Sequence, residues 1–247
     1  MGSLKRLILV TAVALAATTA AKAADLPDPI IPAQEFIPEE VGGGWYLRGD
    51  IGVDFFNSPD AVYNNWLQFS GEKLQTAGMI GVGAGYQFNE WIRADLTADW
   101  RGTSFNGKTA CGLPCNPGAL TQENADIGIF TGMANIYLEA GNFNGFTPYV
   151  GGGIGFAHLR LHDYVGINPN GTSNSFNDKN KTNFAWNLTA GTSYDIWDNL
   201  AVDANYRYVD FGDIGTGGDP AGNLPGTVEF DKLTAHEIRV GLRYYLN

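Results

Sequence analysis

The last fourteen residues constrain the fold more than any other stretch of the chain. Their apolar side chains are Ile238, Val240, Leu242, Tyr244 and Leu246, and the residues between them are Glu237, Arg239, Gly241, Arg243 and Tyr245. Alternation with a period of two is typical of a β-strand that has two different faces. In an outer membrane the apolar face of such a strand meets lipid, and the polar face meets the inside of a barrel. The segment therefore predicts a membrane-spanning β-strand.

Seven earlier segments repeat this pattern. With the C-terminal one, the predicted strands are about 44–56, 76–88, 91–101, 126–140, 147–159, 183–196, 199–211 and 234–247. Long connections at about 57–75, 102–125, 160–182 and 212–233 alternate with short ones at 89–90, 141–146 and 197–198. This layout predicts an all-β fold, an eight-stranded antiparallel transmembrane β-barrel with short periplasmic turns and long extracellular loops.

The N-terminal residues predict export. Lys5 and Arg6 precede an apolar run, and a small-residue cleavage motif ends at Ala23. We interpret 1–23 as a Sec signal peptide rather than a retained anchor, because the apolar run is short for a bilayer. The proline-rich segment 24–43 is predicted to be a periplasmic tail, and 44–247 the outer-membrane barrel.

Charge and cysteine content narrow the class further. The formal net charge is −11, and loss of 1–23 removes three basic residues and no acid, which makes it −14. An acidic protein is a poor partner for nucleic acid. The two cysteines, Cys111 and Cys115, lie too far apart for a CxxC motif, so we expect a loop disulfide, with two free thiols as the alternative.

One face of the predicted strands carries most of their charge. The residues expected to point into the barrel and form an interior charge network are Arg48, Asp50, Arg93, Asp95, Asp99, Arg101, Glu139, Asp203, Arg207, Glu237, Arg239 and Arg243. The interior of an eight-stranded barrel is just wide enough for its own side chains. A packed core of ion pairs is the first interpretation, and a selective channel for small solutes is the alternative.

Aromatic residues gather at the strand ends. The predicted girdle consists of Trp45, Phe55, Phe88, Trp91, Trp100, Phe156, Trp186, Trp197 and Tyr208. Two aromatic rows at the two membrane interfaces are typical of outer-membrane barrels. A soluble lipocalin-like barrel would share the alternation, but the charge-free face, the girdle and the alternating loop lengths favour the membrane barrel.

Catalytic and cofactor motifs are weak. None of the three histidines, His158, His162 and His236, has a serine two residues later, as lipid A deacylases of this barrel size would. The glycine-rich runs 81–85 and 151–155 are not followed by a helix pattern, so they predict relief of crowding inside a barrel rather than a nucleotide loop. We expect no enzyme activity and no cofactor or resident metal. The alternative is that His158 and His162, beside Tyr164, contact haem or a metal.

Several segments resemble a known family. They are Trp45-Tyr-Leu-Arg-Gly-Asp-Ile-Gly52, Gly83-Ala-Gly-Tyr-Gln-Phe88, Thr147-Pro-Tyr-Val-Gly-Gly-Gly-Ile-Gly-Phe156, Tyr206-Arg-Tyr-Val-Asp-Phe-Gly-Asp213 and Arg239-Val-Gly-Leu-Arg-Tyr244. They are similar to the small outer-membrane barrels of alphaproteobacteria, which include the group-3 outer-membrane proteins of brucellae and rhizobial relatives, within the OmpA-like set. The chain departs from the usual pattern in ending on Leu246 and Asn247, where an aromatic residue normally serves assembly.

The resemblance implies location in the outer membrane and leaves three functional hypotheses. The first is a structural barrel that supports envelope integrity and displays its loops. The second is a small-solute porin, and the third is a surface receptor or adhesin that contacts haem or a host through the loops. Expected partners are outer-membrane lipid, lipopolysaccharide with its bridging divalent cations, and the barrel-assembly machinery.

Overall fold

A computed structural model describes residues 43–63, 67–111, 118–220, 222 and 226–246. The predicted signal peptide, all but the last residue of the predicted tail, and Cys115 lie outside these residues. Within them, no helix is long and apolar enough to cross a membrane.

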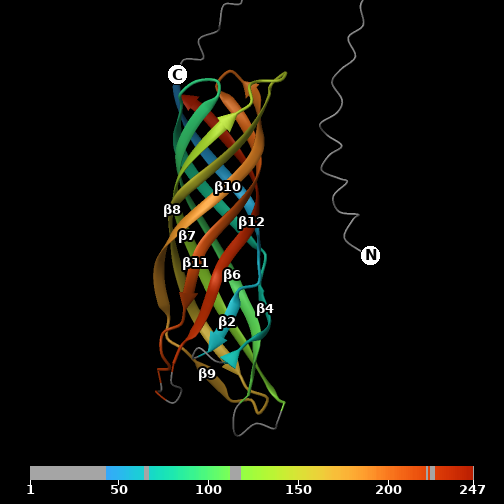
Figure 1. Ribbon diagram of the computed structural model, residues 1–247, viewed down its shortest axis with the longest axis vertical. Helices are drawn as coiled ribbons and strands as arrows, with labels where there is room; N and C mark the ends of the chain where they lie inside the picture. Colours follow the sequence, from blue (N-terminus) through green and yellow to red (C-terminus); the bar gives the residue numbers. More distant parts are fainter. Residues whose placement is uncertain (1–42, 64–66, 112–117, 221, 223–225, 247) are drawn as a thin grey trace, which may run out of the picture. The chain divides into compact units, whose positions relative to one another are not determined.

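Eight long strands form a closed ring (Figure 1). They are β1 (Gly44–Phe56), β5 (Ala77–Gln87), β6 (Ile92–Ala110), β7 (Leu120–Glu139), β8 (Phe146–Ile167), β10 (Lys179–Trp197), β11 (Leu200–Gly215) and β12 (Val228–Leu246). Each pairs antiparallel with its neighbour in this order, and β12 pairs with β1 from Leu246↔Trp45 to Ala235↔Phe56. The predicted eight-stranded antiparallel barrel is therefore confirmed.

Four short strands stand at the end of the barrel that carries the long connections. They are β2 (Asp60–Tyr63), β3 (Leu67–Gln68), β4 (Ser70–Leu74) and β9 (Ser173–Ser175). β2 pairs with β12 and β4 pairs with β6, so both continue the barrel wall beyond the shorter β1 and β5. In Figure 1 this extracellular end is at the bottom, and the C-terminus marks the periplasmic end at the top.

The outer surface has a wide apolar band. Outward side chains such as Leu96, Ile136 and Val240 are at least half exposed in the isolated chain. Such a band is unfavourable in water and matches the lipid-facing surface of a membrane barrel. The band ends toward the extracellular side at Trp100 and, on the neighbouring strands, at Phe130, Phe156 and Phe184. We call the wall beyond these four residues the extracellular extension.

The extension corrects the predicted loops. β6 continues to Ala110, β7 already begins at Leu120, and β8 continues to Ile167. Much of the predicted loops 102–125, 160–182 and 212–233 is therefore paired strand, and this part of the prediction was wrong. The physical reason is a reversal of the pattern: beyond the lipid band the inner face becomes apolar and the outer face polar.

Side chains in the extension show this reversal directly. Phe105, Ile127 and Leu159 point inward and are at most 1% exposed, whereas the outward Lys108 and Gln122 are exposed. An extension in water needs an apolar core of its own, because no lipid covers its outer face. Along the same strands, the apolar face is therefore outward in the membrane band and inward in the extension. The extension has the polarity of a β-structure in water.

Candidate functional site

The structure places all twelve residues of the predicted charge network inside the barrel. Six arginines and six carboxylates are each at most 8% exposed. Burial of this many charges is tolerable where each has a partner of opposite sign. The geometry of these pairs therefore decides whether the lumen can hold water or is closed.

Three groups of ion pairs stack along the lumen. Nearest the periplasm, Arg93 Nε donates to Glu139 Oε1 at 2.6 Å. The Arg93 guanidinium also lies 4.0 Å from the centre of the Tyr137 ring and 4.5 Å from that of Tyr149, within cation–π range. Arg243 lies 3.6–3.7 Å from Glu139 and Asp203, so these pairs are looser.

The middle group is centred on Arg48. Its guanidinium contacts Asp50 at 2.7 Å and Asp95 at 2.8 Å, and the Asn135 amide donates to Asp95 at 2.8 Å. Asn187 in turn donates to Asn135 at 2.9 Å. These bonds connect β1, β6, β7 and β10, so the group extends across the barrel.

The third group lies next to the extracellular extension. Arg239 holds Asp99 with two hydrogen bonds of 3.2 and 2.7 Å, and it also donates to Glu237. Arg101 donates to Glu237 at 2.8 Å and contacts Asp54 at 3.4 Å. Two-pronged arginine–carboxylate contacts are among the strongest polar interactions and fix the geometry of both partners.

Sequence reasoning left Asp54 out of the network, although it is fully buried in the third group. The signal was present, because Asp54 continues the inward positions 46, 48, 50 and 52 of β1.

Inward glycines make room for the network. A side-chain carbon added at Gly81 would lie 2.2 Å from Asp99 Oδ1, and one added at Gly241 would lie 2.2 Å from Asp50 Oδ1. A larger residue at either position would force the neighbouring aspartate out of its present place in the network. The predicted role of these glycines in relieving crowding matches this geometry.

An apolar cluster occupies the lumen of the extension. Its central contacts are Phe105 with Phe230 at 4.7 Å and with Phe69 at 5.9 Å between ring centres, both edge to face. The other large members include Leu74, Ile127, Ile129, Leu159, Leu161, Tyr164, Phe176, Phe211, Ile214, Val228 and Leu233, and Met133 continues the cluster into the membrane band. The sequence analysis missed this cluster, because it treated the outer parts of these strands as loops and assigned an interior role only to the charged residues.

A cavity of about 370 Å³ lies beyond this cluster, lined by residues that include Tyr63, Phe176 and Glu123. Burial raises the pKa of the Glu123 carboxyl, which belongs to the extracellular extension, because water no longer stabilises its charge. A 2.7 Å hydrogen bond donated by Thr109 acts in the opposite direction.

The aromatic girdle residues all lie on outward-facing positions or in the short turns. Seven are 44–68% exposed: Trp45, Phe55, Phe88, Trp91, Trp100, Phe156 and Trp197. Trp186 and Tyr208 are half-buried because their rings pack against each other at 5.6 Å. Trp45 and Trp197 stand at the periplasmic end, and Trp100 and Phe156 border the extension.

The structure separates residues that the sequence analysis grouped. His158 and His162 face outward, whereas Tyr164 is 2% exposed and points into the lumen. The three therefore cannot form one haem or metal site. Cys111 is disulfide-bonded; because Cys115 lies outside the described residues, the Cys111–Cys115 pairing stays a prediction.

Comparison with known proteins decides the family. The family model described as outer membrane protein beta-barrel domain matches residues 9–245. The chain belongs to this family. Membership in the outer membrane protein beta-barrel family places it in the outer membrane. The strand pattern predicted the same location.

Relatives of this family member include proteins of Brucella and Rickettsia. An uncharacterized protein of Brucella suis is 33% identical, over 92% of this chain and 94% of its own length. A candidate adhesin of Rickettsia bellii is 32% identical, over 81% of this chain and 87% of its own length. The predicted resemblance to brucella barrels is therefore confirmed.

A solved structure shows the same fold. It is the outer membrane protein OprG of Pseudomonas aeruginosa, with a TM-score of 0.54 and 17% identity, over 84% of this chain and 98% of that one. At this identity the likeness concerns the fold alone.

Proposed function

We propose that the protein is a closed structural barrel, which supports outer-membrane integrity and displays its extracellular extension and loops. The observation that carries this proposal is the double filling of the lumen. Within the membrane band the lumen is filled by charged side chains that are at most 8% exposed. In the extension it is filled by a cluster of apolar and aromatic side chains. Its partners are outer-membrane lipid and lipopolysaccharide around the apolar band, and the assembly machinery during insertion.

The burial of the arginines argues against the channel alternative. Arg93, Arg101 and Arg239 are at most 1% exposed, so the lumen around them leaves almost no space for water. A conducting pore keeps its charged residues in contact with water. The ion pairs here instead join opposite walls of the barrel and close the lumen. We therefore propose a binding or structural role rather than transport, and we propose no enzyme activity.

We expect the refolded mature protein, residues 24–247, to show no stable conductance in a planar lipid bilayer. The physical reason is that ions would have to displace the paired arginines and carboxylates and then cross an apolar cluster. A β-barrel that conducts in the same assay provides the positive control. A reproducible open state would contradict the closed barrel and make Arg93 and Arg207 candidates for selectivity.

Envelope integrity provides the second part of this test. Deletion of the gene is expected to increase detergent sensitivity, and expression of the closed barrel is expected to restore resistance. Unchanged sensitivity after deletion would exclude the structural role.

A second candidate function is adhesion, favoured by the candidate adhesin of Rickettsia bellii among the relatives. The extension places the connection 168–178, between β8 and β10, at the far end of a rigid wall. A rigid support far from the membrane suits contact with another cell, because binding surfaces are commonly loops held by a scaffold.

Bacteria that carry the barrel in their outer membrane are expected to adhere to host cells. We expect replacement of 168–178 by a short turn to abolish this adhesion. The matched control is the same replacement of the periplasmic connection 140–145, which leaves adhesion unchanged. Heat-dependent gel mobility verifies that both variants fold. Full adhesion by the 168–178 variant would exclude this connection as the binding surface.

A further inference from the structure

The outer wall of the extension carries a group of potential metal ligands that no comparison assigns. Asp126 on β7 lies directly opposite His162 on β8 in the strand ladder. Asp163 follows His162 at a point where the pairing register shifts, and its backbone has a positive φ of 55°. Such a bulge turns a side chain away from the strict alternation of a strand. Aspartate is among the residues that tolerate this backbone conformation.

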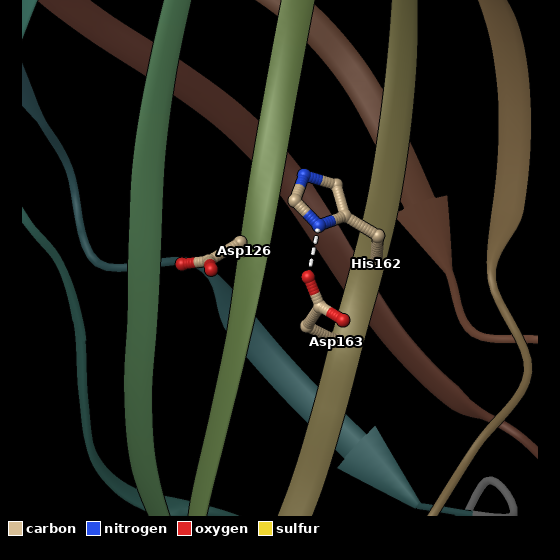
Figure 2. A group of neighbouring side chains, drawn as sticks. All are labelled: Asp126, His162 and Asp163. Atoms are coloured by element: carbon tan, nitrogen blue, oxygen red, sulfur yellow. Dashed lines mark hydrogen bonds and ion pairs between the residues drawn. The ribbon is translucent and has the colours of Figure 1, made fainter.

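We propose that Asp126, His162 and Asp163 form a binding site for a divalent transition metal ion such as Zn²⁺. One ligand atom from each residue lies within 4.8 Å of the others. His162 Nδ1 and Asp163 Oδ2 are 2.8 Å apart, and Figure 2 shows their side chains facing each other. Zinc ligands lie about 2.0–2.2 Å from the ion, so binding would draw the three ligand atoms closer together than they lie here.

The surrounding structure holds Asp126 in place. Ser104 on the neighbouring strand β6 donates a 2.5 Å hydrogen bond to Asp126 Oδ1. Metal-ligating carboxylates are usually oriented by such second hydrogen bonds. Ser104 is thus a positioning residue, and the site draws on three adjacent strands of a rigid wall rather than on a loop.

A hollow beside the cluster leaves room for the ion. It has a volume of about 220 Å³ and is lined by residues that include Asp126, His162, Ser104 and Trp100. Its space comes from a glycine pair, because Gly102 lies opposite Gly128 on the outer face, and no atom comes within 4 Å of a side chain added at Gly102. Three protein ligands next to open space match zinc sites that keep one position for an outside ligand.

The ligand types select the class of metal. Ca²⁺ and Mg²⁺ prefer sites made of oxygen atoms, whereas an imidazole nitrogen beside carboxylates suits Zn²⁺ and other first-row ions. The location is also informative, since Trp100 marks the edge of the lipid band. An ion here would lie at the level of the lipopolysaccharide head groups. This inference does not depend on whether the barrel is closed or conducting.

Zinc titration of the refolded mature protein by isothermal calorimetry tests the proposal. We expect saturable binding of one ion, and Asp126→Asn, His162→Asn and Asp163→Asn each to weaken it by at least about tenfold. Ser104→Ala is expected to weaken it by about 10-fold, since loss of an outer partner typically costs 10- to 100-fold in affinity.

The matched control is His158→Asn. His158 lies on the same outward face of β8, exposed and bonded to Thr182 at 2.8 Å, and is not part of the cluster. We expect this variant to bind zinc as the unmodified protein does. His162→Gln replaces His162→Asn if the latter fails the gel-mobility test of folding. Absence of saturable binding by the unmodified protein, or unchanged binding by a folded His162 variant, would overturn the proposal.

Discussion

Replacement of Arg239 by alanine is expected to lower the free energy of unfolding by about 3–5 kcal/mol, the usual cost of breaking a buried ion pair. Arg239 is fully buried and pairs with Asp99 and Glu237. Its loss removes two hydrogen bonds from Asp99 and one from Glu237 in a lumen that water does not reach, and Arg101 remains bonded to Glu237 at 2.8 Å. Arg101 and Arg207 still contact Asp99 at 3.5 and 3.7 Å, so the cost is expected to stay within this range rather than exceed it.

Urea-induced unfolding of the barrel in lipid vesicles, followed by tryptophan fluorescence, measures this effect. The matched control is Arg160→Ala, since Arg160 is also paired with an aspartate, Asp178, at 3.9 Å, but its side chain is 63% exposed. Exposed pairs contribute about 0–1 kcal/mol, so the control is expected to unfold almost as the unmodified protein does. Equal losses in the two variants would contradict a buried, water-free network.

The charge network also shows which features of the barrel interior the alternation of residues in the sequence can predict. Inward positions of a strand follow from a period of two, so the side of the wall on which Arg48 or Arg239 lies was predictable. Which carboxylate each arginine contacts was not, because partners such as Arg101 and Glu237 come from strands far apart in the chain. Those contacts depend on the shear of the closed ring, which no single strand encodes.

The extension was missed for a different physical reason. Lipid imposes one polarity on the outer face, and the prediction assumed that this polarity marks the whole strand. Beyond Trp100 the environment is water, so the apolar Phe105 occupies an inward position, as the charged Arg101 and Asp99 do four and six residues earlier. The reversed alternation is clearest on β8, where Leu159 and Leu161 point inward and His158 and Arg160 outward. Between 102 and 110, Phe105 is the only large apolar residue on the inner face, so the pattern there is weak.

The candidate metal cluster could not be predicted from the sequence. Asp126 and His162 are 36 positions apart, and they meet because the register of β7 and β8 places them opposite each other. Asp163 joins them through a local bulge, whose position no composition rule reveals. The sequence analysis named His162 as a potential ligand, but it chose Tyr164 as the neighbour, and the extra residue at the bulge sends Tyr164 to the opposite face.

Replacement of Phe105 by alanine is expected to cost about 3–5 kcal/mol, the usual cost of deleting a buried phenyl ring. Phe105 is fully buried, and its ring packs edge to face against Phe69 and Phe230. These partners come from the first extracellular connection and from β12, so the cavity would loosen contacts between distant segments. The membrane band contains none of these rings, and its ion pairs are expected to remain intact.

The expected result is therefore loss of stability together with local opening of the extension. Urea unfolding measures the first, and limited proteolysis of the vesicle-inserted barrel measures the second, with cleavage expected in the extension and not between Ile92 and Trp100. Ile167→Ala is the matched control, because Ile167 is an apolar residue of the same extension that is 46% exposed. Its truncation leaves no cavity and is expected to cost below about 1 kcal/mol. If Phe105→Ala resisted protease like the control, the apolar cluster would not be what holds the extension together, and the wall hydrogen bonds alone would have to account for its rigidity.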